Sequence, residues 1–335
     1  MIGNDLDKAA RLGYWLRSRY RPRNNVLWVV SGEYNDTSGW TPALYESVAQ
    51  ELMDGHQGHH LMTIHPAGDQ SSSQDFHASS WLSCNLLQSG YQSDNQASVG
   101  SENYEVIMHD YQRAPVKPVA DGEPAYEDFL DGFLDKGTSD ARIEGDTVRR
   151  KAYWAVFAGA FGHTYGNENV EILYSPGDDD VDFPHRYWKE ALNDLGATQM
   201  RHVRTLMESR SLLNRIPYQS IVVSPVGSGL DHVQATRASG GKYAMIYIPR
   251  GGSVDVNLAK ITGQGVAASW FNPRDGSTTQ IGLYSNSGTR TFDAPDGIAN
   301  GNDWILLLDS TNGTGVASAI CVGDDAGRSR RTHAP

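Results

Sequence analysis

The chain has few cysteines and no long apolar run, and both absences narrow its class. Cys84 and Cys321 are the only cysteines among 335 residues, so neither a disulfide framework nor a cysteine-type zinc site is expected. No stretch approaches the roughly 20 apolar residues that a membrane-spanning helix needs. Residues 1–4 offer neither the basic nor the apolar region of a secretory signal peptide. We therefore expect a globular protein without a membrane span.

Basic residues are also scarce relative to acidic ones. The 28 Lys and Arg stand against 40 Asp and Glu, which gives a net charge of −12 and makes nucleic acid a poor partner. Hydrophobic residues make up 39% of the chain, enough for the core of one large domain or two moderate ones. Trp and Tyr number 8 and 16; such flat side chains can stack on sugar rings, although protein cores use them too.

Short apolar runs alternate with helical patterns over the first two thirds of the chain. Asn4 or Asp5 is expected to cap a helix that reaches Arg19. Strands are predicted near residues 26–30, 61–65, 85–90, 117–122 and 158–166, and further helices over residues 41–55, 102–113, 142–157 and 188–207. This alternation favours a parallel sheet, most simply a barrel, of which five strands are present.

The pattern changes after about Ser220. Short β runs, separated by Pro and Gly turns and without helices, predict an antiparallel β-sandwich. We expect this sandwich to fold by itself, because its strands would close on each other. Residues 310–335 are rich in Gly, Ser, Thr and Arg and are predicted to form a disordered tail.

Two carboxylates, Glu33 and Glu123, occupy equivalent places in this pattern. Each follows a short apolar run in a turn of small residues, which predicts the C-terminal end of a buried parallel strand. The interval between them holds three (β/α) units of about 30 residues each, so both are expected at one mouth of a barrel. Two carboxylates at one mouth are the minimal equipment for glycoside hydrolysis.

Several segments resemble the apiosidase-like glycoside hydrolase family. They are residues 28–34, 65–82, 87–90, 117–127 and 159–167, including the strings Asp121-Gly122-Glu123-Pro124-Ala125-Tyr126-Glu127 and Gly162-His163-Thr164-Tyr165-Gly166. The resemblance implies a (β/α)8 TIM barrel followed by a small sandwich of the type named a collagen-binding domain. The family barrel begins before the position of Met1. We therefore expect strands four to eight over residues 1–219, without about the first three, and the sandwich over residues 220–309.

The resemblance also implies roles for individual residues. Glu33, at the end of strand four, would be the acid/base, and Glu123, at the end of strand seven, would be the nucleophile of a retaining hydrolysis. The substrate would be a plant-type polysaccharide containing apiose or a related pentose. The side chains expected around this substrate are Tyr34, His65, Trp81, Gln88, His163 and Tyr165. No cofactor or metal is expected, and full-length members would be secreted or periplasmic.

Other interpretations stay open at this point. Without about the first three strands, the chain could be inactive as a glycoside hydrolase. Alternatively, the barrel could be vestigial, and the chain a non-catalytic carbohydrate- or matrix-binding protein. His56, His59 and His60 suggest a metal cluster, but their Gly-rich surroundings favour a solvated loop. The triplet at residues 149–151 is predicted to form a solvated basic helix face, and the long polar loop at residues 66–80 to contribute to the mouth.

Overall fold

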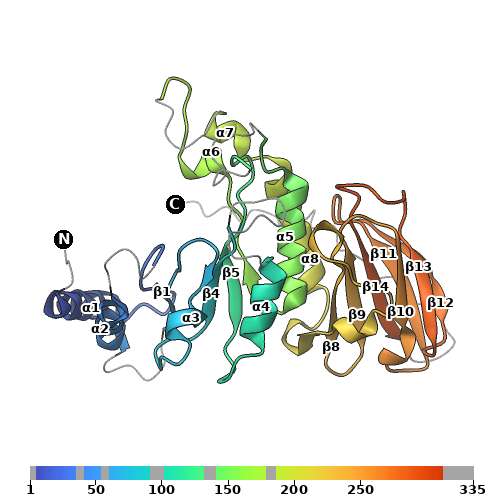
Figure 1. Ribbon diagram of the computed structural model, residues 1–335, viewed down its shortest axis with the longest axis horizontal. Coiled ribbons are helices and arrows are strands. Elements are labelled where there is room, and N and C mark those ends of the chain that lie inside the picture. Colours follow the sequence, from blue (N-terminus) through green and yellow to red (C-terminus); the bar gives the residue numbers. More distant parts are fainter. Residues whose placement is uncertain are drawn as a thin grey trace, which may run out of the picture.

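The computed structural model describes residues 5–34, 41–53, 60–90, 102–131, 141–178 and 186–311. These residues form a mixed α/β part and, beside it, an antiparallel β part (Figure 1). The expected tail beyond Thr311, together with His56 and His59, lies outside the described residues.

Short parallel strands form the centre of the α/β part. One parallel pair consists of β1 (Trp28–Val29) and β2 (Met62–Thr63). A second ladder consists of β4 (Asn85–Gln88), β5 (Val119–Glu123) and β6 (Gly162–His163), with β3 (Gln70–Ser71) antiparallel at its edge. The expectation of parallel strands alternating with helices is confirmed for the described residues, among which no ladder joins β6 to β1.

Helices lie before, between and after these strands along the chain. They are α1 (Leu6–Tyr20), α2 (Pro42–Met53), α3 (Ser73–Phe76), α4 (Asn103–Tyr111), α5 (Gly145–Ala158), α6 (Glu168–Glu171), α7 (Trp188–Ala191) and α8 (Leu195–Glu208). Asp5 caps α1, accepting hydrogen bonds from the N–H groups of Asp7 and Lys8 at 3.1 Å each. Gly13 permits the close contact of α1 with α2, because a Cβ there would lie 2.6 Å from the Val48 carbonyl oxygen.

The loop at residues 66–80, predicted to contribute to the mouth, contains a run of three serines at residues 71–73, two of which hydrogen bond to a helix. Ser71 ends β3 and Ser73 begins α3, and the hydroxyls of both donate to the fully buried carboxylate of Asp110 in α4, at 2.5 and 2.6 Å. The prediction that this loop contributes to the mouth does not hold for these serines, because their hydrogen bonds tie the loop to the helix layer.

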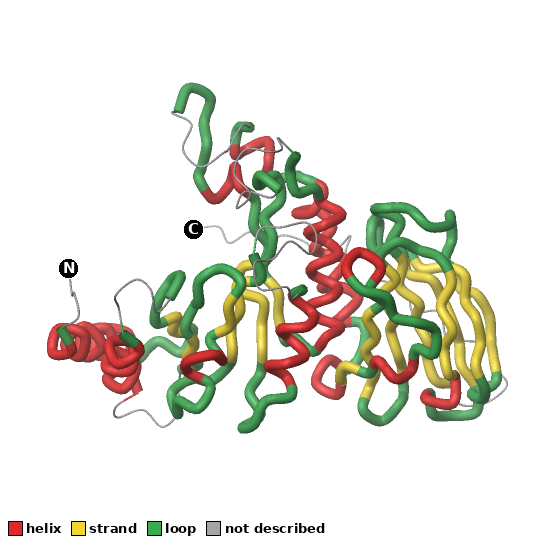
Figure 2. The backbone as a smooth tube through the Cα atoms, in the orientation of Figure 1, coloured by secondary structure: helices red, strands yellow, loops and turns green. Residues whose placement is uncertain are grey.

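The β part contains two antiparallel sheets (Figure 2). One has the strand order β12-β11-β14-β9-β8-β7 and the other pairs β10 with β13. Their bounds are β7 (Arg215–Pro217), β8 (Gln234–Ala238), β9 (Tyr243–Ile248), β10 (Ser253–Asn257), β11 (Gly265–Phe271), β12 (Thr278–Tyr284), β13 (Thr289–Asp293) and β14 (Trp304–Thr311). The sheet thus begins before Ser220 and extends two residues into the segment predicted as tail.

Both faces of β9 and of most of β14, at the centre of the larger sheet, are buried, whereas β12 at its edge is largely exposed. Residues such as Ile246 and Leu306 face the second sheet, where they pack with Val254 and Phe292. The alternate residues of β9, such as Met245 and Tyr247, face the other way and share a core with α5 and α8. In Figure 1 these two helices are the ones of the α/β part that lie next to the β part. The expectation that the sandwich strands close only on each other is therefore wrong.

The basic triplet of α5 is buried rather than solvated. Arg149, Arg150 and Lys151 are exposed by only 2%, 6% and 4%. Arg149 forms an ion pair with Asp303 of the β part, and Lys151 forms one with Glu102 at the start of α4. The prediction of a solvated face was wrong because α5 packs between the sheet and the sandwich, where each paired cation has an acidic partner.

Candidate active site

Four of the expected site residues come together at the C-terminal edge of the parallel strands. Glu33 follows β1, His65 follows β2, Gln88 ends β4 and Glu123 ends β5. Parallel strands present their carboxyl ends at one edge, so residues far apart in the sequence meet there.

The Gln88 amide links the two carboxylates. Its Nε2 donates to Glu123 Oε1 at 3.1 Å and to Glu33 Oε1 at 3.5 Å. An amide nitrogen carries two hydrogens, so one side chain can serve both acceptors. The sum of the 3.1 and 3.5 Å contacts limits the distance between these two oxygens to about 6.6 Å.

His65 connects the same two residues from the other side. Its Nδ1 accepts the backbone N–H of Glu33 at 3.4 Å, and its Nε2 lies 3.1 Å from Glu123 Oε2. Because Nδ1 is the acceptor, the proton of a neutral imidazole is on Nε2 and is donated to Glu123. The backbone of one carboxylate residue thereby orients the donor to the other.

The two carboxylates differ in their surroundings. The Glu123 side chain is only 14% exposed and His65 only 15%, whereas Glu33 lies in an exposed turn with a left-handed backbone (φ 47°). Glu123 is thus recessed among hydrogen-bond donors, and Glu33 faces solvent.

Tyr126 is a site residue that the sequence prediction missed. Burial and the nearby charge of Glu123, to which it is hydrogen bonded, raise the pKa of its phenol well above the usual value, so the hydroxyl keeps its proton and donates. The signal was available, because Tyr126 stands three residues after Glu123 in the string that carries the family resemblance.

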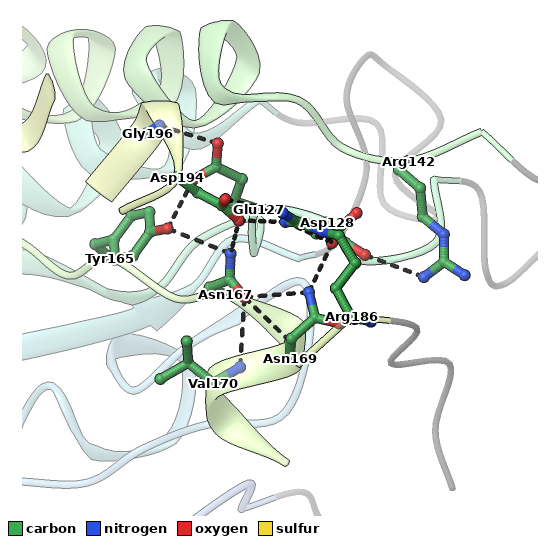
Figure 3. A network of polar contacts seen from close by, with 10 residues as sticks. All are labelled: Glu127, Asp128, Arg142, Tyr165, Asn167, Asn169, Val170, Arg186, Asp194 and Gly196. Atoms are coloured by element: carbon green, nitrogen blue, oxygen red, sulfur yellow. Dashed lines mark hydrogen bonds and ion pairs between the residues drawn. The ribbon is translucent and has the colours of Figure 1, made fainter. Parts of the chain in front are cut away.

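Tyr165 belongs to a neighbouring polar network rather than to the carboxylate cluster. Its hydroxyl donates to Glu127 Oε2 at 2.7 Å, and the N–H of Gly196 donates to Glu127 Oε1 at 2.9 Å (Figure 3). Glu127 thereby accepts a hydrogen bond from a backbone N–H in the first turn of α8, where such groups have no partner within the helix. Burial raises the pKa of Glu127. Asn167 and Arg186 extend the network to the acidic residues Asp128 and Asp194.

His163 lies beneath the mouth. Its side chain is 4% exposed, with Nδ1 4.0 Å from Asp121 Oδ2. Burial lowers the pKa of His163 to about 3, so the imidazole is neutral at neutral pH. Asp121 in turn accepts hydrogen bonds from Ser89 and from Asn103 of α4, at 2.8 and 3.1 Å. Asp121 therefore faces the helix layer, and the His163 ring is buried beside it.

Trp81 and Tyr34 are core residues in the structure. Both are 2% exposed, and the indole N–H of Trp81 donates to Glu46 at 2.7 Å. The Tyr34 ring contacts Phe76 edge-on, with the ring centroids 5.1 Å apart. Contrary to the expectation of substrate contacts, neither ring presents a face to solvent on which a sugar could stack.

The described residues contain no group of three His, Cys, Asp or Glu side chains arranged to hold a metal ion. Within that same part of the chain, no helix is both long and apolar enough to cross a membrane. Cys84 is a buried free thiol.

Comparison with known proteins identifies both parts. Residues 4–214 match the family described as "Apiosidase-like, catalytic domain", and residues 216–309 match "Putative collagen-binding domain of a collagenase". A solved structure titled "Glycoside hydrolase" is similar with a TM-score of 0.84 at 31% identity, covering 92% of this chain and 69% of its own. A family 5 glycoside hydrolase from Bacteroides vulgatus gives a TM-score of 0.83 at 30% identity, with coverages of 91% and 66%.

The chain therefore spans about two thirds of the length of these two proteins, at 69% and 66%. No curated protein matched the sequence. The family match covers most of the α/β part and contains the carboxylate cluster, and the structural matches extend over nearly the whole chain. The chain belongs to the apiosidase-like family, with the fold of a glycoside hydrolase.

Proposed function

We propose that this protein hydrolyses a glycosidic bond with retention of configuration, with Glu123 as nucleophile and Glu33 as acid/base. The substrate class we propose is a plant-type polysaccharide containing apiose or a related pentose. The observation that carries the proposal is the Gln88 amide bridging the two carboxylates, at 3.1 and 3.5 Å.

The division of roles follows from the hydrogen bonds. Glu123 receives donors from Gln88, His65 and Tyr126, and donors stabilise the charged form of a carboxylate, as a nucleophile requires. Among the described residues, the Glu33 side chain has one hydrogen bond, a long one of 3.5 Å from Gln88, and Glu33 is exposed to solvent. It can therefore give a proton to the leaving oxygen and later take one from water.

The separation of the carboxylates favours retention. Retaining pairs stand about 5–5.5 Å apart and inverting pairs about 6.5–9.5 Å. The upper limit of about 6.6 Å set by the contacts of 3.1 and 3.5 Å admits the first range and only the lower edge of the second. In the first step, Glu33 protonates the departing oxygen while Glu123 attacks the anomeric carbon. In the second step, Glu33 deprotonates a water that displaces Glu123.

The proposed frame is a (β/α)8 barrel with its site at the C-terminal edge of the strands. Parallel strands, helices that follow them and carboxylates at that edge all support it. We assign residues 1–219 to the catalytic domain and residues 220–309 to the sandwich. Strand β7 shows that the sandwich sheet also takes in a few residues before Ser220.

Alanine variants test these roles. Glu123→Ala should lose all hydrolysis, because no nucleophile remains. Glu33→Ala should lose about 10²- to 10⁴-fold in kcat/KM on a glycoside with a poor leaving group, but little in kcat/KM on an aryl glycoside whose leaving group needs no proton. On the aryl glycoside the glycosyl-enzyme should then accumulate, because no base activates the water of the second step. Azide should restore turnover of Glu33→Ala and give a glycosyl azide of retained configuration.

The control is Glu190→Ala, which removes an exposed carboxylate of α7 and should leave kcat unchanged. Equal losses by Glu33→Ala on both kinds of leaving group would mean that Glu33 is not the acid. Sugar binding without hydrolysis by the unchanged chain would favour the non-catalytic binding protein.

A further inference from the structure

Strand β5 contains one extra residue between its two acidic side chains. In the parallel ladder with β4, Leu87 is opposite Asp121 and Gln88 is opposite Glu123. One step along β4 therefore matches two steps along β5, and Gly122 is the additional residue. This is a β-bulge, which re-aims the side chains on either side of it.

The bulge sends the two carboxylates in opposite directions. In a regular strand, residues two apart point to the same face, so Asp121 and Glu123 would lie together. Instead Asp121 is fully buried with Asn103 of α4 as a partner, while Glu123 meets Gln88 at the mouth. The local backbone of Gly122 therefore decides where the proposed nucleophile points.

A side chain at position 122 would not fit this arrangement. A Cβ built on Gly122 would lie 2.6 Å from both Cγ and Cδ1 of Leu86 on the neighbouring strand. A larger residue at the bulge would therefore have to displace the Leu86 side chain.

Thr164 holds the bulge from the strand on the other side. Its N–H donates to the carbonyl of Asp121 at 3.1 Å, and its hydroxyl donates to the carbonyl of Gly122 at 2.7 Å. From the β4 side, the N–H of Ser89 donates to the carbonyl of Glu123 at 3.0 Å. A bulged carbonyl lies outside the regular ladder and needs such a partner.

We propose that Thr164 is a positioning residue for Glu123, acting through the Gly122 carbonyl. The inference rests on the proposed function, since it concerns the direction of the nucleophile. The hydroxyl fixes the peptide that precedes Glu123, so the carboxylate stays in contact with Gln88 and in line with the anomeric carbon. Thr164 acts through this peptide, because its hydroxyl is donated to the Gly122 carbonyl.

The test compares Thr164→Val with Thr164→Ser. Valine keeps the shape and removes the hydroxyl, and serine keeps the hydroxyl. A small misplacement of a reacting group can cost about 100-fold, so we expect Thr164→Val to lower kcat by about ten- to 100-fold at nearly unchanged KM. Thr164→Ser should stay close to the unchanged chain. The control is Thr198→Val, because that exposed hydroxyl also donates to a backbone carbonyl, at 2.9 Å, but in α8.

Crystal structures of the same variants provide a readout that does not depend on activity. Thr164→Val should lose the Glu123–Gln88 contact, which is 3.1 Å here, and Thr164→Ser should keep it. If the unchanged chain hydrolyses no glycoside, the proposed function fails, while the two crystal structures still decide whether Thr164 positions Glu123. Retention of both the contact and kcat in Thr164→Val, or a lower melting temperature alone, would overturn the inference.

Discussion

Asp121 and His163 are buried residues whose pKa values move in opposite directions. Burial raises the pKa of Asp121 from 3.8 to about 6, although hydrogen bonds from Asn103 and Ser89 oppose this. Burial lowers the pKa of His163 from 6.5 to about 3. Each residue is therefore pushed toward its neutral form in the folded chain, and each makes stability depend on pH with its own sign.

For Asp121, the folded state holds the proton to higher pH than the unfolded state. Its contribution to stability is complete below its usual pKa of 3.8 and is lost as pH rises toward about 6. In Asp121→Asn the side chain cannot titrate, so the variant should not lose stability over this pH range for this reason. The free energy of unfolding of the variant, relative to the unchanged chain, should therefore increase between pH 4 and 6 in urea titrations. Asp296→Asn, at an exposed position, is the control, and parallel pH curves for Asp121→Asn would contradict the argument.

For His163 the sign is reversed. The unfolded state takes up a proton on His163 as pH falls below 6.5, whereas the folded state does so only near pH 3. The contribution of His163 to the free energy of unfolding is therefore lost as pH falls from 6.5 to about 3. His163→Gln, measured in the same titrations, should flatten the fall in stability between pH 6.5 and 4. A variant as steep as the unchanged chain would mean that His163 does not couple folding to pH.

The sequence predicted site residues correctly where their place at the end of a strand was enough to bring them to the site. It failed where the direction of the side chain determines whether a residue reaches the site. Glu33 and Glu123 could be predicted at one edge because each follows an apolar run. Trp81 and Tyr165 also lie near strand ends or in shared motifs, yet one is in the core and the other bonds Glu127. The extra residue at Gly122 has no periodic signature in a strand of five residues, so the direction of Glu123 could not be derived.

At the scale of elements, the environment of α5 was the least predictable from the sequence. Its basic triplet has the composition of a solvated face, but the acidic partners are distant in the chain. Asp303 is 154 residues from Arg149, and Glu102 is 49 residues from Lys151. Composition within the helix carries no information about such partners. The helix as an element was predicted, whereas its complete burial depends on the sandwich packed against it.

The Arg149–Asp303 pair provides a prediction at this scale. Two hydrogen bonds, at 2.9 and 2.7 Å, join the side chains, which are each 2% exposed. Arg149→Met should lower the free energy of unfolding by about 3–5 kcal/mol, because it leaves Asp303 buried without its cation. The double variant Arg149→Met/Asp303→Leu should recover part of that loss in urea unfolding.

The matched control is the exposed pair of Arg204 and Glu208, whose side chains are 77% and 59% exposed. Arg204→Met should change stability by less than about 1 kcal/mol. Additive losses in the Arg149→Met/Asp303→Leu cycle would show that the two side chains do not stabilise the fold as a pair.

At the scale of the whole molecule, the α/β part and the larger sandwich sheet share one core. Tyr153 of α5 stacks on Tyr247 of β9 with ring centroids 5.3 Å apart, and Trp154 donates its indole N–H to the carbonyl of His232 at 2.9 Å. The sequence predicted two units correctly from the change in periodicity. The continuous apolar runs of β9 and β14 do indicate strands that are buried on both faces. They do not indicate that α5 and α8 cover the second face, so the union of the two units could not be predicted.

This shared core predicts how the sandwich behaves alone. Residues 215–311 expressed by themselves would expose the helix-facing side of β9 and β14, including Met245, Tyr247 and Leu307. Exposed apolar patches of this kind promote association, so the fragment should bind a hydrophobic dye and aggregate. In the complete chain, both parts should unfold in one calorimetric transition.

Threonine substitutions on the two faces of β9 separate this explanation from a general weakness of the fragment. Met245→Thr removes apolar surface that only the helices cover, so it should make the fragment more soluble while it destabilises the complete chain. Ile246→Thr lies on the opposite face, in the core between the two sheets, so it should destabilise both. The melting temperatures and soluble yields of the four proteins decide the matter. If residues 215–311 melt cooperatively at the temperature of the complete chain, the helices do not stabilise the sheet. If they do stabilise it, removing them should lower its melting temperature.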